Sequence, residues 1–314
     1  MAAVSSISID LDGLPHYYGI HGQVAPKSAG PCTAGLRRFL DLLQEKDLKA
    51  TFFVIGQDLD DPEFQEQMRR AIGAGHELAN HTWSHAYDLT RSPSESMRQE
   101  ISRCHRQVAE VLNVEMVGFR APGYTITNSL LDVVQGLGYR YDSSVFPCPL
   151  YYGAKASVLG AMALFKKNSR AILGPPQVLL APTEPYRPDT LAWWTLGHRP
   201  LWEIPIGVEP WSRWPFIGTA LVTMGRHTST WLAQRMCKRD FVGLECHGVD
   251  LMDADDVGVN STLAQSQRDL RIPWNKKARV LGEVLDVLAA GRNVDTLAQY
   301  VTRLPGQGLP AASP

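Results

Sequence analysis

The chain has 314 residues, of which 44% are hydrophobic and 20% are charged, and its formal net charge at pH 7 is -1. This composition is typical of a globular protein with ample material for a core. Lysine and arginine form no long cluster, only doublets such as Lys166-Lys167 and Lys276-Lys277. The charge pattern therefore excludes a surface built for nucleic acid, and we expect no such partner.

Other features of the composition bear on location. No run of about 18 uncharged apolar residues occurs, so we expect no membrane span. Residues 1–6 carry no basic group, and Asp10 interrupts the apolar residues that follow, which argues against a secretion signal. The five cysteines are odd in number and contain no C-x-x-C pair, as is typical of reduced thiols. These features predict a cytoplasmic protein and leave its oligomeric state open, a homo-oligomer included.

Strands and helices alternate in the first half of the chain. The patterns predict strands at residues 6–13, 50–56, 76–85, 116–120 and 139–144, of which 6–13 and 76–85 run into the loop that follows. Helices are predicted at 33–46, 62–74, 93–112 and 128–137. Thr33 is the expected N-cap of the first helix. Strands that alternate with helices across short connections favour a parallel sheet, as in an α/β barrel or an open α/β fold.

The pattern fails between residues 147 and 200, where proline or glycine recurs every few residues. We predict an irregular insertion that lies over one end of the barrel and determines specificity. Strands at 201–206 and 241–247 follow, with an aromatic-rich loop at 211–215 and helices at 228–239, 276–290 and 295–304. One domain over residues 1–304 and a flexible tail at 305–314 are therefore expected.

Polar side chains recur at the carboxyl ends of the predicted strands. They are Asp10, Asp12, His81, His85, Arg120, Asp142 and His247. Active sites of α/β barrels and open parallel sheets assemble at that end. Histidines four residues apart also occur as surface pairs, but two imidazoles with one carboxylate form the donor set of catalytic zinc, which leaves coordination positions open.

The remaining residues of this group suit metal-assisted hydrolysis of an amide or ester. A second carboxylate on the first strand can accept a proton from water, and Arg120 can keep that base ionised. His247, from another strand, can protonate a leaving group. Glu245 and Asp250 are candidates for supporting these groups from behind.

Six segments of the chain together resemble a known family. They are Ile9-Asp10-Leu11-Asp12 and the segments at 51–56, 75–85, 120–124, 141–144 and 244–247. In this order they are similar to the successive motifs of the polysaccharide deacetylases, also called carbohydrate esterase family 4 or the NodB-homology group. The resemblance covers about residues 6–247 apart from the insertion. It implies a distorted (β/α)7 barrel that removes an N-acetyl group from an amino sugar or a related glycoconjugate.

The resemblance also implies a cofactor and its ligands. One divalent metal ion would be held by Asp12, His81 and His85, with Zn²⁺ expected and Co²⁺, Ni²⁺ and Mn²⁺ as alternatives. In the implied reaction, water bound to this metal attacks the carbonyl of the amide. The family has adjacent aspartates where this chain has Asp10-Leu11-Asp12, so the base and ligand roles of these two residues could be exchanged.

Further roles follow from the same resemblance. Asp10 matches the general base, His247 the general acid and Arg120 the arginine that tethers the base. Asp142 matches an acid that tunes the histidine or holds the arginine. The N–H of Gly123 matches an oxyanion donor, although Gly123 stands where an aromatic residue is common in the family. Tyr124, His16 and Trp83 are the remaining candidates for contact with substrate.

Three functions stay open at this point. The first is N-deacetylation of an amino sugar. The second is hydrolysis of another C–N bond by the same fold, either deformylation of a formamido sugar or ring opening of a cyclic amide, as in allantoinase-like enzymes. The third is a barrel that binds carbohydrate without turning it over.

Overall fold

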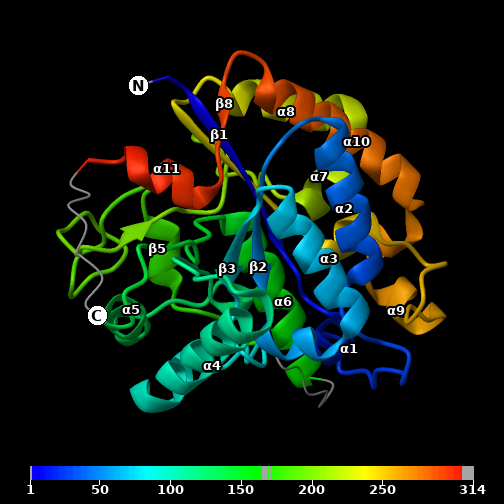
Figure 1. Ribbon diagram of the computed structural model, residues 1–314, viewed down its shortest axis with the longest axis horizontal. Coiled ribbons are helices and arrows are strands. Elements are labelled where there is room, and N and C mark those ends of the chain that lie inside the picture. The colour runs from blue at the N-terminus through cyan, green and yellow to red at the C-terminus, as the bar shows by residue number, and fades with distance from the viewer. Residues whose placement is uncertain (1, 165–168, 170, 306–314) are drawn as a thin grey trace.

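The computed structural model describes residues 2–164, 169 and 171–305 (Figure 1). The tail predicted for residues 305–314 lies outside these residues, apart from Pro305. Among the described helices, none combines the length and the apolar character that crossing a membrane requires.

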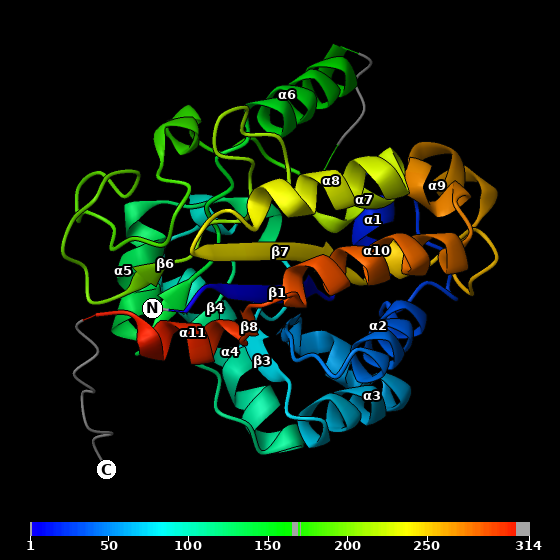
Figure 2. The ribbon, with the colours of Figure 1, turned by 90° about the horizontal axis from the view of Figure 1, so that it is seen from above.

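A parallel sheet forms the centre of the molecule. Its strands are β1 (Val4–Asp10), β2 (Thr51–Val54), β3 (Glu77–Asn80), β4 (Gly118–Phe119), β5 (Tyr141–Asp142), β6 (Trp202–Glu203), β7 (Phe241–His247) and β8 (Asn293–Val294). Seven of them pair in the order β6-β5-β4-β3-β2-β1-β7, and β8 pairs with the start of β1. The sheet curls into a half-barrel surrounded by helices, which confirms the predicted distorted (β/α)7 barrel (Figures 1 and 2).

Strand β1 is buried over its whole length because it lies between β2 and β7. Its pairing with β7 runs from Val4 opposite Phe241 to Asp10 opposite His247. Two polar residues that are far apart in the sequence therefore meet at the carboxyl end of the sheet. The polar ends of the other parallel strands point to the same edge, because parallel strands share one direction.

The helices surround this sheet. They are α1 (Leu14–Ile20), α2 (Thr33–Glu45), α3 (Pro62–Gly73), α4 (Ser94–Leu112), α5 (Asn128–Gly136), α6 (Pro149–Leu164), α7 (Gly218–Met224), α8 (Arg226–Met236), α9 (Ser261–Ser266), α10 (Trp274–Ala289) and α11 (Leu297–Arg303). Those predicted from helical periodicity agree with the structure to within about three residues at either end. In α4, for example, Met97, Ile101 and Val108 are buried along one face, as the spacing predicts.

Two expectations about helices were wrong. Thr33 is not the N-cap of α2, because Cys32 occupies that position and no side chain caps the helix. The insertion at 147–200 is not irregular throughout, since α6 spans 16 of its residues. Pro149 begins α6, where a proline is tolerated because its missing N–H would have no partner in the helix. From there to Leu164 the chain holds no further proline and is rich in alanine and leucine, which favours a helix.

Candidate active site

The candidate metal ligands meet where β1 and β3 end. Asp12 lies two residues beyond β1, and His81 directly follows β3. One carboxylate oxygen of Asp12 lies 3.2 Å from Nε2 of His81, and the other lies 3.2 Å from Nε2 of His85. All three residues are buried, and one potential ligand atom of each lies within 4.8 Å of the other two.

Hydrogen bonds aim the two imidazoles. Nδ1 of His81 lies 2.8 Å from the backbone oxygen of Arg120, so a proton on Nδ1 is donated there and Nε2 is left as a lone-pair donor for a ligand. The backbone of His85 has φ +53°, a left-handed conformation, and its N–H donates to Oγ1 of Thr82. This turn brings the second imidazole back over Asp12.

Several buried polar atoms here lack a hydrogen-bond partner. Oδ1 of Asp12 and both ring nitrogens of His85 accept or donate no hydrogen bond, despite the short distance between the two side chains. A buried polar atom without a partner costs free energy, so such atoms need a ligand or a role. Two imidazoles and one carboxylate are a donor set that binds divalent metals such as zinc. The residues present therefore fit a metal ion.

The protonation of these groups agrees with that fit. Burial lowers the pKa of His85, which favours the neutral imidazole that binds metals. Burial alone would raise the pKa of Asp12, but the imidazoles of His85 and His81 hold it well below its usual range, so Asp12 is ionised. The carboxylates of Asp10 and Asp12 raise the pKa of His81 against the effect of burial. A cation bound here would compete with that proton.

Asp10 is held on one side and open on the other. Nη1 of Arg120 donates to Oδ1 of Asp10 at 2.5 Å. Oδ2 of Asp10 has no hydrogen-bond partner and lies 3.8 Å from Nε2 of His81. One oxygen is thus anchored, and the other lies beside the candidate metal ligands, where it can accept a proton.

Arg120, which directly follows β4, also bonds to Ser8 of β1 and to Ser143, the residue after β5. Its Nε donates to the backbone oxygen of Ser143, and its Nη2 donates to Oγ of Ser143 and Oγ of Ser8. The guanidinium carbon also lies 4.0 Å from the ring centroid of Phe53. The buried guanidinium of Arg120 needs a carboxylate partner, because an unpaired buried charge is strongly destabilising. The ion pair between the two side chains therefore fixes the position of Asp10.

His247 lies on the other side of Asp10, at the end of β7. Its Nε2 is 3.1 Å from the hydroxyl of Tyr124, and its Nδ1 is 3.0 Å from Oε1 of Glu245. Burial opposes the charged form, but the carboxylate of Glu245, with smaller effects from Asp12 and Asp10, raises the pKa of His247 to about 9. At neutral pH the imidazole is therefore protonated and can act as an acid.

The sequence indicates only a supporting role for Glu245, behind the groups proposed to react. The structure buries it fully and sets it directly against the imidazole of His247. The signal for this contact is present in the sequence, because residues 245 and 247 of one strand face the same side of the sheet.

Asp142 is fully buried, which raises the pKa of its carboxyl, and it lies close enough to Arg120 for the guanidinium charge to oppose that effect. In the described part of the chain, no hydrogen bond or ion pair joins it to Arg120 or His247. Its carboxylate accepts from the hydroxyl of Ser144 at 2.7 Å, and that hydroxyl accepts from the backbone N–H of Ala121 at 2.8 Å. Asp142 thus supports the loop after Arg120, while the neighbouring Ser143 contacts the guanidinium itself.

The candidates for substrate contact divide into two groups. Gly123 and Tyr124 line the cavity beside Asp10 and Asp12, and Gly123 has φ +61°, a conformation that side chains disfavour. Trp83 is not among the residues that line this cavity, and its ring packs against Gly56 and lies 3.9 Å from the guanidinium carbon of Arg103. His16 does not line the cavity either.

The position of His16 follows from α1, which directs this side chain inward. Its ring centroid lies 4.4 Å from that of His85. His16 therefore packs behind a candidate metal ligand instead of facing substrate.

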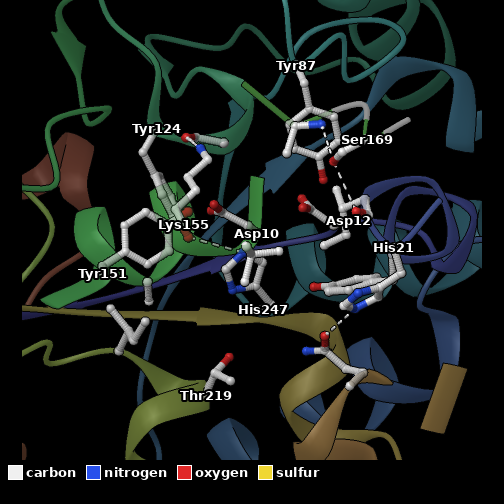
Figure 3. Close-up of a pocket in the computed structure, with 18 of the residues that line it drawn as sticks. Asp10, Asp12, His21, Tyr87, Tyr124, Tyr151, Lys155, Ser169, Thr219 and His247 are labelled. Atoms are coloured by element: carbon white, nitrogen blue, oxygen red, sulfur yellow. Dashed lines mark hydrogen bonds between the residues drawn. The ribbon is translucent and has the colours of Figure 1, made fainter. Parts of the chain in front are cut away.

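A cavity of about 460 Å³ opens over these groups. Its floor is polar, with Asp10, Asp12, His81 and His247, and Tyr124 stands at the side (Figure 3). Tyr151 and Lys155 of α6 and Thr219 of α7 belong to its outer walls. The cavity is large enough for a small substrate, and polar groups that can take up or give a proton line its floor.

Comparisons with known proteins agree with this fold. Residues 28–141 match the family model described as polysaccharide deacetylase. The chain is 32% identical over 102 residues to a chitin deacetylase of Pestalotiopsis, an alignment that covers 32% of this chain and 34% of the relative. It is 24% identical over 144 residues to a peptidoglycan deacetylase of Helicobacter pylori, which covers 44% and 47% respectively. The chain thus spans less than half the length of these two curated relatives.

A solved structure shows the fold over nearly the whole chain. A protein of Mycobacterium smegmatis assigned to the polysaccharide deacetylases superposes with a TM-score of 0.58 at 17% identity, covering 96% of this chain and 89% of that one. The half-barrel of parallel strands and the matched motifs define the class, a deacetylase-like (β/α)7 barrel. Residues 28–141 thus match the polysaccharide deacetylase family, and the whole chain shares the fold of the Mycobacterium smegmatis protein.

Proposed function

We propose that this protein is a metal-dependent hydrolase that removes an N-acetyl group from an amino sugar or a related glycoconjugate. The observation that carries the proposal is the set of buried donor atoms without hydrogen-bond partners on Asp12 and His85, beside the open oxygen of Asp10. The relatives named as chitin and peptidoglycan deacetylases support the choice of an N-acetylated sugar.

Asp12, His81 and His85 would hold the metal ion, with zinc expected from the two imidazoles and one carboxylate. When bound, such an ion polarises an amide carbonyl and makes a water molecule acidic enough to attack at neutral pH. The geometry favours Asp12 over Asp10 as the ligand, because Asp12 touches both imidazoles and Asp10 is paired with Arg120.

Asp10 would act as the general base. Its free oxygen accepts a proton from the attacking water, while Arg120 holds the other oxygen in place. Since the pair is buried, water does not screen this interaction strongly.

His247 would act as the general acid. Its Nε2 lies toward Tyr124 at the side of the cavity, and a proton on this nitrogen is given to the departing amine. Glu245 keeps the imidazole charged until that transfer occurs. We assign the backbone N–H of Gly123 as a donor to the developing oxyanion, since Gly123 lines the cavity next to these groups.

The test is product release as a function of metal. The protein is stripped with a chelator, reloaded with Zn²⁺ and incubated with N-acetylglucosamine oligomers, formamido sugars and cyclic amides while acetate, formate and ring-opened products are measured. Acetate release that requires the metal is the expected result. Asp12→Asn should lower metal content and acetate release together, the latter by roughly a thousandfold or more, because a ligand is lost. Asp255→Asn, a change at an exposed acid, is the matched control.

Other outcomes contradict the proposal. A protein that binds no divalent ion and gains no activity when one is supplied is not a metal-dependent hydrolase. Formate or a ring-opened product would show a different C–N hydrolase of the same fold. Tight metal binding without any product would favour the non-catalytic barrel.

A further inference from the structure

The outer part of the cavity differs in chemistry from its floor. Its walls come from one face each of three helices, with Tyr17 and Ile20 of α1 on one side and Ala220 of α7 on another. The third wall is α6, from the insertion. Figure 2 shows α6 standing out from the body of the molecule.

Helix α6 presents an apolar stripe to the cavity. The residues that line it are Tyr151, Ala154, Lys155, Val158 and Leu159, spaced i, i+3, i+4, i+7 and i+8. A stripe with this spacing normally packs on a hydrophobic core. In α6, however, no residue is buried, and Val158 is 53% exposed. The stripe therefore forms the wall of a binding space and is not part of the core.

The single charge of this stripe, Lys155, lies at its middle. Nζ of Lys155 donates to the backbone oxygen of Gly123 at 3.0 Å, next to the floor of the cavity. Val158 and Leu159 lie one turn further along α6. The cavity is therefore polar and charged at the floor and apolar at Val158 and Leu159 of α6 and at Ile217 and Ala220. The rest of its lining includes polar groups, namely His21, Ser169, Thr219, Thr223 and Gln267.

We propose that the substrate is an amphiphilic amide, with a polar amide-bearing head on the floor and an apolar chain or ring system along the α6 wall. The proposal rests on the amide hydrolysis proposed above and concerns the substrate class of that same site. Sugar hydroxyls along this wall would lose hydrogen bonds to water without gaining partners, whereas an apolar chain gains free energy from every methylene buried there. A long polysaccharide fits such a wall poorly.

The apolar group can lie on either side of the amide. It is the acyl chain if the nitrogen carries a fatty acid, and it is the aglycone if an N-acetyl sugar is linked to an apolar alcohol. Both share the chemistry that the wall recognises. Two substrate series distinguish them: methyl glycosides of glucosamine with N-acyl chains of two to eight carbons, and N-acetylglucosamine glycosides with alkyl aglycones of one to eight carbons.

The experiment measures KM in both series below the concentrations at which micelles form. In one of the two, KM should fall roughly threefold with each added methylene until the wall is covered, as expected for partly buried methylenes. Binding is measured in parallel by calorimetry with octyl and methyl glycosides of glucosamine, which contain no amide and cannot be hydrolysed. If the aglycone series is the responsive one, the octyl compound should bind at least tenfold more tightly.

Matched variants locate the effect on α6. Leu159→Asp, in the stripe, should remove most of the gain from the longer chain, and so should Val158→Asp, at a half-exposed position that tolerates a charge. Leu150→Asp introduces the same change on the same helix outside the cavity lining and should keep the gain.

Flat dependence on chain length in both series, with acetate still released, would overturn this inference and leave the hydrolase intact. So would an equal loss of the gain in Leu150→Asp and Leu159→Asp. If no amide is hydrolysed at all, the proposed function fails, and calorimetry still decides the inference. N-octylglucosamine and N-methylglucosamine, which are amines and cannot be hydrolysed, test the acyl side in the same way. Tighter binding of the octyl compound in either pair that Leu159→Asp removes supports the apolar wall, and equal binding within both pairs rejects it.

Discussion

The floor and the outer walls of the cavity are built on different principles. On the floor, Asp10, Arg120 and His247 are each fixed by specific hydrogen bonds or ion pairs from neighbouring strands. On the α6 wall, side chains such as Val158 are held by the helix alone and remain half exposed. This difference indicates that the strands fix the positions of the side chains proposed to react. Helix α6 contributes a surface whose side chains can change without moving the side chains on the floor.

The largest expected effect tests the open oxygen on the floor. Asp10→Asn removes the proposed base but no proposed metal ligand, so it should lower kcat by roughly a hundredfold to ten-thousandfold. Metal content, measured by atomic emission, should stay at the wild-type value. A variant that loses both metal and activity would show that Asp10, and not Asp12, is the ligand. Near-normal kcat would show that Asp10 is not the base.

A second large effect concerns stability. Arg120→Ala leaves Asp10 buried and without its partner, and it removes the bonds to Ser8 and Ser143. We expect the free energy of unfolding, measured with urea, to fall by about 3–5 kcal/mol. Leu150→Asp, on the exposed side of α6, should change it by less than about 0.5 kcal/mol. Similar decreases in the free energy of unfolding for the two variants would contradict the difference between a tightly fixed floor and the exposed α6 wall.

The smallest effect appears in the pH dependence. The pKa of His247 is raised to about 9, so the protonated acid is present at lower pH, and kcat/KM should fall as the pH rises through about 9. Glu245→Gln removes the main cause of this upward shift. The alkaline limb should therefore move to lower pH, with little change in maximal kcat/KM. A limb that stays in place would mean that another group titrates there.

The sequence predicted the floor better than the walls because the floor depends on local patterns. The strand at 241–247 and the segment around His81 and His85 show their apolar runs and polar ends directly. Strands that end in polar residues at one edge of a parallel sheet must bring them together. The meeting of Asp12 with both histidines could therefore be foreseen from β1 and β3 alone.

Other features depend on which side chains face each other across the fold. Asp142 follows the family order, but only the structure shows that Arg120 donates hydrogen bonds to Ser143 while Asp142 accepts one from Ser144. Trp83 lies two residues from each of the candidate ligands His81 and His85, yet the backbone has positive φ at Thr82 and His85, and the Trp83 ring packs against Arg103 of α4. Helix α6 was missed because prolines around it indicated a loop, and its place above the floor depends on packing that no local pattern encodes.

The pairing of β1 with β7 has a consequence for how the chain folds. β1 is synthesised long before its partner β7, as the contact between Ser8 and Leu244 across 236 residues shows. Until β7 emerges from the ribosome, that flank of β1 exposes unpaired peptide groups and apolar side chains. Such distant pairing slows folding, and it leaves the nascent chain open to aggregation for most of its synthesis.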